Sequence, residues 1–175
     1  RLPDTKRLAW ADKLLESMKG RRPKNRPEVY AEQARYIHDN PTEKLVLQTL
    51  RIGDLGITVT PNEVYAITGL KLKARSPFAS TFNIELANGA AGYIPPPEQH
   101  ALGGYTTWPA RTAGLEVQAE PKIVETLLTS LESLAGKPRK KPTVRNDAYA
   151  NAILTEKPLV YWQCEEFDGG ILEDA

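Results

Sequence analysis

The sequence predicts an α/β protein in which a mixed β-sheet packs against helices. Segments with helical spacing of apolar residues alternate with segments that have the two-residue period of strands, and such alternation favours a layered α/β architecture. The chain has 175 residues, of which 41% are hydrophobic and 26% charged, so it can form a core. A Gly53-Asp54 pair between two strand-like runs predicts that the first strands are neighbours.

Two amphipathic helices are expected first, over residues 5–19 and 28–38. Thr5 is a suitable N-cap for the first, and Pro27 leads into the second. A basic loop separates them. Apolar residues recur at three- and four-residue spacing in the first helix, where they are Leu8, Ala11, Leu15 and Met18.

Strands are expected over residues 43–52 and 55–60, joined at Gly53-Asp54. Pro61 and Asn62 end the second strand. Asn62 is expected to cap a helix that runs from Glu63 to about Lys73.

A third strand is expected over residues 80–88, because Phe82, Ile84 and Leu86 alternate with polar residues. An irregular loop over residues 88–114 follows. The strongest helix signal covers residues 119–136, where Gly136 ends an apolar stripe made of Ile123, Val124, Leu127, Leu128, Leu131 and Leu134.

Composition divides the chain into an α/β body over residues 1–136, a basic Pro-containing linker over residues 137–146, and the start of a second unit over residues 147–175. That unit is expected to contain a short helix and one strand, near residues 159–164. One strand cannot bury its own face, so the unit is expected to be incomplete.

The formal net charge of +1 gives no general attraction for nucleic acid, and no apolar run reaches the length of a transmembrane helix. Cys164 is the only cysteine, so no disulfide is expected within the chain. The chain begins with Arg1 and lacks a signal-peptide pattern, and we expect it to be a piece of a longer protein.

Two places carry candidate chemistry. Glu63 is expected where a strand leads into a helix, a position at which α/β proteins often place functional groups. The alternative is that its carboxylate only complements the helix dipole. Tyr93 and Tyr105 lie twelve residues apart on a loop stiffened by prolines, where two phenols could act as a ligand and a hydrogen-bond donor. The alternative is that both, with Trp108, are aromatic residues that pack the loop.

At these residues the sequence resembles a known family. "LRIGDLGITVTPNEVYAITG" followed by "NIELANGAAGYIPPPEQHALGGY" is similar to the C-terminal part of the catalytic domain of the neutral/alkaline (non-lysosomal) ceramidase family, most of all its bacterial members. The resemblance covers roughly residues 43–136. It implies a partial catalytic domain of a zinc-dependent amidase that hydrolyses the N-acyl bond of ceramide or a related lipid amide.

The family's zinc site implies roles for three residues. The glutamate of the "P-x-E" turn falls on Glu63 and the zinc tyrosine of the "GY" motif on Tyr93, while the second, oxyanion-stabilising tyrosine falls on Tyr105. The family's two zinc histidines and its nucleophilic serine lie upstream, and His38 and His100 do not match them. We therefore expect the rest of the parent chain to complete the site, and this chain alone to be inactive.

The last residues, "AYANAILTEKPLVYWQCEEFDGG", are similar to the opening of laminin-G or concanavalin-like β-sandwich modules, which implies a truncated sandwich at the C-terminus and a glycan or protein partner. The family and this tail imply a secreted or cell-envelope protein. Two alternatives stay open: a non-catalytic cell-surface or glycan-binding protein that retained the fold, and an α/β domain whose loop is only structural.

Overall fold

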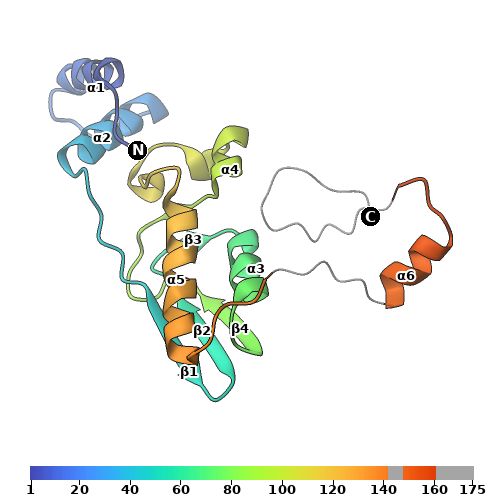
Figure 1. Ribbon diagram of the computed structural model, residues 1–175. Coiled ribbons are helices and arrows are strands. Elements are labelled where there is room, and N and C mark those ends of the chain that lie inside the picture. Colours follow the sequence, from blue (N-terminus) through green and yellow to red (C-terminus); the bar gives the residue numbers. More distant parts are fainter. Residues whose placement is uncertain (142–147, 161–175) are drawn as a thin grey trace.

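The protein has an α/β fold with a small mixed sheet, as the sequence predicts (Figure 1). The computed structural model describes residues 1–141 and 148–160. The helices are α1 (Thr5–Met18), α2 (Arg26–Asp39), α3 (Ala66–Arg75), α4 (Pro97–Leu102), α5 (Ala119–Ala135) and α6 (Ala148–Thr155). The strands are β1 (Gln48–Ile52), β2 (Leu55–Val59), β3 (Glu63–Val64), β4 (Ser80–Ile84) and β5 (Tyr93–Ile94). Two 3₁₀ turns are η1 (Tyr105–Thr107) and η2 (Arg111–Ala113).

The main sheet has three strands in the order β1-β2-β4. Strands β1 and β2 form an antiparallel hairpin around Gly53-Asp54, with Leu50 opposite Ile57. Strand β4 runs parallel to β2 after the connection through α3, and Ile57 is opposite Phe82. This combination confirms the mixed sheet. A second, two-stranded sheet is formed where β3 pairs with β5 in parallel.

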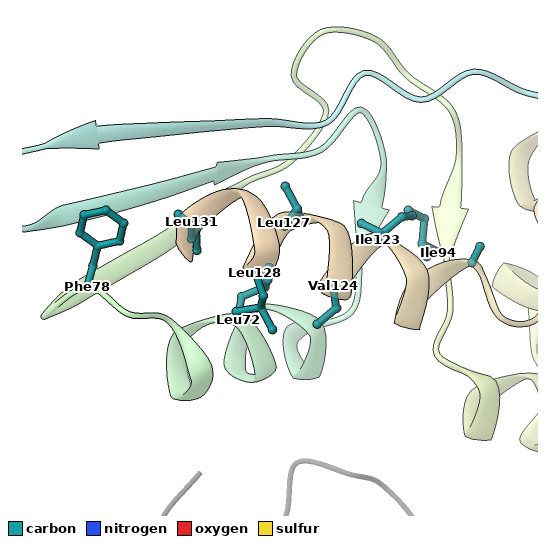
Figure 2. Close-up of a cluster of buried hydrophobic side chains, with 9 residues drawn as sticks. Leu72, Phe78, Ile94, Ile123, Val124, Leu127, Leu128 and Leu131 are labelled. Carbon is teal, nitrogen blue, oxygen red and sulfur yellow. The ribbon is translucent and has the colours of Figure 1, made fainter. Parts of the chain in front are cut away.

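Helix α5 supplies most of the core and covers one face of the main sheet (Figure 2). Its buried stripe includes Leu127, Leu128 and Leu131, each at most 1% exposed. Each fully buried side chain of this kind stabilises the fold by about 1.5–3 kcal/mol. The helix packs closely on β2, because a Cβ on Gly56 would lie 3.3 Å from the Leu131 side chain of α5 and 2.6 Å from the Phe78 ring of the segment between α3 and β4.

Helices α1 and α2 form a helical hairpin, and alanine and leucine side chains pack between them. Helix α1 begins at Thr5 as expected, but Asp4 and not Thr5 is its N-cap, and α2 begins at Arg26, two residues before the expected start. The Asp4 carboxylate accepts a hydrogen bond from the Arg7 N–H at 2.7 Å, and the Asn25 side chain accepts one from Glu28 at 3.0 Å. These caps satisfy N–H groups that have no partner inside the helix.

The expected helix from Glu63 was wrong in its first turn. Glu63 and Val64 lie in β3, and α3 begins only at Ala66. Asn62 does not cap the helix, because its side chain is fully buried and donates a hydrogen bond to the Ala91 carbonyl at 3.0 Å. Residues 62–64 therefore bond to the segment after β4 and do not form the helical turn that local sequence rules predict.

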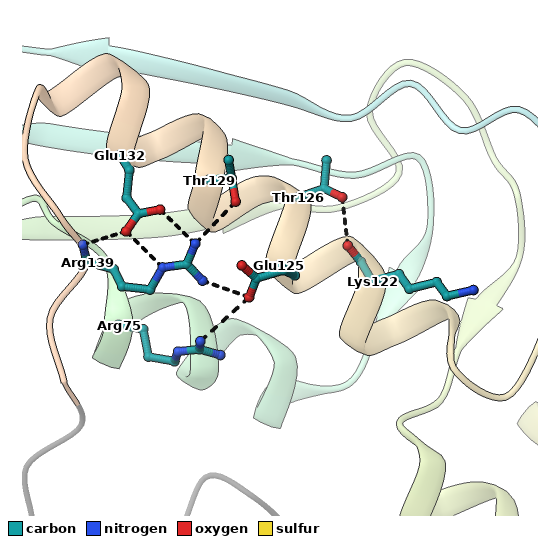
Figure 3. A network of polar contacts seen from close by, with 7 residues as sticks. All are labelled: Arg75, Lys122, Glu125, Thr126, Thr129, Glu132 and Arg139. Carbon is teal, nitrogen blue, oxygen red and sulfur yellow. Dashed lines mark hydrogen bonds and ion pairs between the residues drawn. The ribbon is translucent and has the colours of Figure 1, made fainter.

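The N-terminal part of the expected linker is fixed to the body (Figure 3). The Arg139 guanidinium binds Glu132 and Glu125, each at 2.7 Å. The Lys140 N–H donates to the Arg75 carbonyl at 2.9 Å. Residues 139 and 140 thus join α3 and α5, while residues 142–147 lie outside the described part of the chain.

The short helix expected near the C-terminus is present as α6. The strand expected over residues 159–164 and the truncated β-sandwich start fall largely outside the described residues. Within residues 1–141 and 148–160, the helices are too short or too polar to cross a lipid bilayer.

Candidate functional site

The pairing of β3 with β5 brings two of the three sequence-predicted site residues together. Glu63 is the direct register partner of Tyr93, and Val64 is the partner of Ile94. Val64 and Ile94 pack into the α5 cluster, and Figure 2 shows Ile94 beside Ile123. Because side chains alternate along a strand, Glu63 and Tyr93 point away from α5 and lie side by side on the other face.

Backbone geometry holds this pair in register. The Glu63 N–H donates to the Gly92 carbonyl at 3.1 Å. Gly92 has a φ of 75°, and a Cβ there would lie 2.4 Å from the Thr112 carbonyl oxygen. Only glycine fits such a left-handed position against another backbone. The glycine of the "GY" motif is therefore required for Tyr93 to reach β3.

Tyr105 completes the predicted trio. Its ring packs edge-on against the Tyr93 ring, with 5.5 Å between centroids and an interplanar angle of 90°. Gly103 and Gly104, both at positive φ, turn the chain from α4 into the 3₁₀ turn that starts at Tyr105. The Tyr105 side chain is 65% exposed, whereas Tyr93 and Glu63 are half-buried. The site therefore has a reachable outer phenol and a more enclosed inner phenol and carboxylate.

The electrostatics of the trio favour a neutral inner phenol. The pKa of Tyr93 is raised above its ordinary value of 10.0, first by its interaction with the Tyr105 phenol and then by partial burial and the negative charge of Glu63. Among the described residues, no lysine or arginine forms an ion pair with Glu63. A carboxylate that lies beside the Tyr93 phenol and forms no ion pair within the described residues is in an environment that a bound cation would stabilise.

The donor types fit part of a zinc site. Zinc accepts carboxylate oxygen, and catalytic zinc sites use three protein ligands and leave one position open. In the described part of the chain, no three His, Cys, Asp or Glu side chains come together. His38 lies in α2 and His100 in α4, and neither belongs to the Glu63–Tyr93 pair. Glu63 and Tyr93 could hold a metal only with further ligands.

The structure adds a residue that the sequence analysis missed. The Tyr65 hydroxyl is 2.7 Å from the Thr106 hydroxyl, and Thr106 directly follows Tyr105. Tyr65 thereby links the start of α3 to the turn that carries Tyr105. Its position two residues after Glu63 would have placed it on the same side of a strand, but the expected helix from Glu63 concealed that relation.

A buried carboxylate, that of Glu120, is linked through Lys71 to α4, the helix that precedes Tyr105. Glu120 is 1% exposed and accepts hydrogen bonds from Thr68 at 2.8 Å and from Lys71 at 3.3 Å. The Lys71 ammonium also lies 3.8 Å from Glu98 of α4. One lysine thus connects α3, α5 and α4, the helix that precedes Tyr105. Sequence spacing gives no sign of this contact, because its three members are far apart in the chain.

A comparison with protein-family models finds no match to this chain, and searches of curated proteins and of solved structures find none either.

Proposed function

We propose that this chain supplies part of a zinc-dependent site that hydrolyses the N-acyl amide of ceramide or a related lipid amide. Glu63 and Tyr93 would be metal ligands, and Tyr105 would donate a hydrogen bond to the substrate carbonyl oxygen. The observation that supports this most is the convergence of the three residues: Glu63 and Tyr93 are register partners, and the Tyr105 ring contacts Tyr93. The sequence resemblance assigns the same three positions.

Each residue has a distinct task in this proposal. Zinc, when bound, supplies a Lewis acid that polarises the amide carbonyl. Glu63 contributes a negative carboxylate, and Tyr93 an oxygen held beside it by the strand pairing. The exposed Tyr105 hydroxyl is free to approach a substrate and to donate to the oxygen that gains negative charge. Such donors stabilise a transition state because they are already oriented before the reaction.

The rest of the parent chain is part of the proposal. Three protein ligands are usual for catalytic zinc, and an amide needs an attacking nucleophile as well. We therefore expect the 175-residue chain alone to release no fatty acid from an N-acylsphingosine analogue. If the purified chain hydrolyses the analogue and Glu63→Ala abolishes this activity, the proposal that the rest of the parent chain completes the site is wrong.

Zinc content of the full-length protein tests the metal ligands. We expect about one zinc per chain in the wild type, and a loss of at least about tenfold in zinc affinity in Glu63→Ala and Tyr93→Phe, as for disrupted metal sites in general. Glu43→Ala and Tyr36→Phe are matched controls, because both residues are exposed and lie away from β3 and β5. Zinc that is absent, or present equally in all variants, would refute the ligand assignment and favour a non-catalytic binding protein.

Steady-state kinetics of the same full-length protein tests Tyr105. Loss of one donor to an oxyanion lowers kcat by about 100- to 1,000-fold. We expect Tyr105→Phe to show this loss with its zinc content unchanged. An unchanged kcat in Tyr105→Phe would assign the residue to loop packing.

A further inference from the structure

A cavity of about 630 Å³ lies beside the C-terminal end of α2. Its walls come from segments that are far apart in the sequence: residues 1–2, residues 36–43, residues 90–91 and residues 111–116. Its volume falls within the range of roughly 300–1,000 Å³ that is typical of small-molecule sites. Two arginines line it, Arg1 and Arg111, and their surroundings indicate what it binds.

The Arg111 guanidinium is fixed in orientation at the wall of this cavity. Its Nε–H and its backbone N–H both donate to the side-chain oxygen of Gln33, each at 3.1 Å, and Gln33 is only 9% exposed. The guanidinium also lies over the Tyr36 ring, 4.6 Å from its centroid. Within residues 1–141 and 148–160, neither Nη atom of Arg111 has an acceptor or an acidic partner. A planar guanidinium held in this way offers two parallel N–H groups to an oxyanion.

The Arg1 guanidinium brings a second positive charge to the cavity. Its Nη2 atom donates to the carbonyl oxygens of Thr107 and Ala113, but its Nε–H is buried and has no acceptor among the described residues. Burial and the charge of Arg7 lower the pKa of Arg1 below its ordinary value. A buried donor without an acceptor costs free energy. An anion in the cavity would supply that acceptor and compensate the charge.

The carboxylates of the cavity do not pair with these arginines. Glu43 and Glu116 line it as well, but in the described part of the chain neither forms an ion pair with Arg1 or Arg111. Glu116 pairs instead with Lys122 at 2.6 Å. These side chains, Lys122 included, carry one more positive than negative charge. That excess matches a ligand with a single negative charge better than a phosphate, which is close to a dianion at neutral pH.

Much of the remaining wall is apolar. It is made by Leu2, Ile37, Leu115 and the two alanines at positions 90 and 91, and we call these residues the apolar wall. Small-molecule sites commonly combine such a lining with a few charged groups that fix the orientation of the ligand. A ligand that fits this cavity therefore has an alkyl part as well as an anionic end.

We propose that this cavity binds a small organic monocarboxylate, with its carboxylate on the guanidinium groups of Arg111 and Arg1 and its alkyl part against the apolar wall. This site is separate from the proposed metal site, because Glu63, Tyr93 and Tyr105 are not part of its lining. Binding of the carboxylate requires no metal and no ligand from outside the chain.

An NMR titration of the ¹⁵N-labelled 175-residue chain with sodium hexanoate tests the site. We expect saturable shifts of the amide signals of Ala90, Ala91 and Gly114, which line the cavity. Three comparison ligands separate the features of hexanoate. Acetate lacks the alkyl part, hexan-1-ol lacks the charge, and inorganic phosphate carries a higher charge without an alkyl part. Each should bind more weakly than hexanoate.

Arg111→Met should weaken hexanoate binding by about tenfold or more, because it removes charge-assisted hydrogen bonds. Arg26→Met is the matched control. Arg26 is also exposed and also lies over an aromatic ring, that of Trp108 at 5.8 Å, but it does not line the cavity. Ala90→Leu is a second test variant if Arg111→Met does not fold. It adds bulk at an exposed position of the apolar wall, keeps every charge and should also weaken binding.

Four outcomes would overturn the proposal. The first is the absence of saturable shifts in the wild type, and the second is an unchanged hexanoate affinity in Arg111→Met or, if that variant does not fold, in Ala90→Leu. Hexan-1-ol that binds as tightly as hexanoate would show that the cavity recognises only the alkyl part. Phosphate that binds more tightly than hexanoate would assign the two arginines to a different class of anion. None of these results depends on zinc, so the proposed function is tested separately.

Discussion

The two faces of the main sheet are made by alternate residues of the same strands, yet one is closed by α5 and the other is open. On the closed face, small or hydroxyl-bearing residues such as Gly56 and Thr49 let the helix approach and bond to it. On the open face, large apolar residues such as Ile52 and Phe82 remain exposed. Apolar alternation therefore marks which side of a strand needs a partner, but not whether the same stretch of chain supplies it.

The largest expected effect comes from truncating a leucine on the closed side. Leu128 is fully buried, so Leu128→Ala should destabilise the chain by about 2–5 kcal/mol through lost burial and a residual cavity. Leu50→Ala on the open face should cost about 1 kcal/mol or less, since much of that side chain already contacts water. Urea unfolding followed by circular dichroism measures both. Equal losses would show that the open face is covered within this chain.

A pair of glycines tests how tightly the closed face is packed. Gly56→Ala should destabilise the chain by about 1–3 kcal/mol, because the added methyl group meets Phe78 and Leu131. Gly69→Ala should stabilise it by up to about 1 kcal/mol, because Gly69 lies inside α3 with nothing within 4 Å of a new Cβ. Thermal unfolding reports the sign of each change. A neutral Gly56→Ala would mean that Phe78 and Leu131 can move away from β2 at little cost.

The smallest expected effect on stability concerns the ion pairs that Arg139 forms with Glu125 and Glu132 of α5. Hydrogen bonds from the Arg139 side chain and backbone lower the pKa of Glu132 to about 2 from an ordinary 4.5. A lowered folded-state pKa adds stability above about pH 4.5, and this stability is lost as the pH falls towards 2. Glu132→Gln should therefore lose stability near neutral pH and lose less than the wild type on going to about pH 3.

Urea midpoints at the two pH values measure this, and Glu43→Gln, an exposed residue outside the network, is the control. The same acid dependence in wild type and Glu132→Gln would show that residues 139 and 140 do not hold the linker to α5 in solution.

Local sequence rules worked where neighbouring residues decide the structure. Helix α5 was predicted to within about one residue because its apolar stripe and Gly136 are local signals, and Gly136 ends the helix in the left-handed conformation. The hairpin at Gly53-Asp54 was predicted for the same reason. The rules did not work for Glu63 to Tyr65, where pairing with β5 some thirty residues away replaces the first turn of a helix. They also did not find the short helix α4 inside the expected loop.

The α/β class and the long helix over residues 119–136 could be predicted from the sequence alone, because periodicity and turn residues act over a few residues at a time. Local pattern marked Glu63, Tyr93 and Tyr105 only as candidates, and their roles in a metal site come from the family resemblance and stay a prediction. Three features could not be predicted from the sequence: the register pairing of Glu63 with Tyr93, the contact of Tyr65 with the turn that carries Tyr105, and the face of the sheet that α5 covers. Those outcomes depend on contacts between distant segments, whose geometry is set when the layers pack and not by any single stretch of sequence.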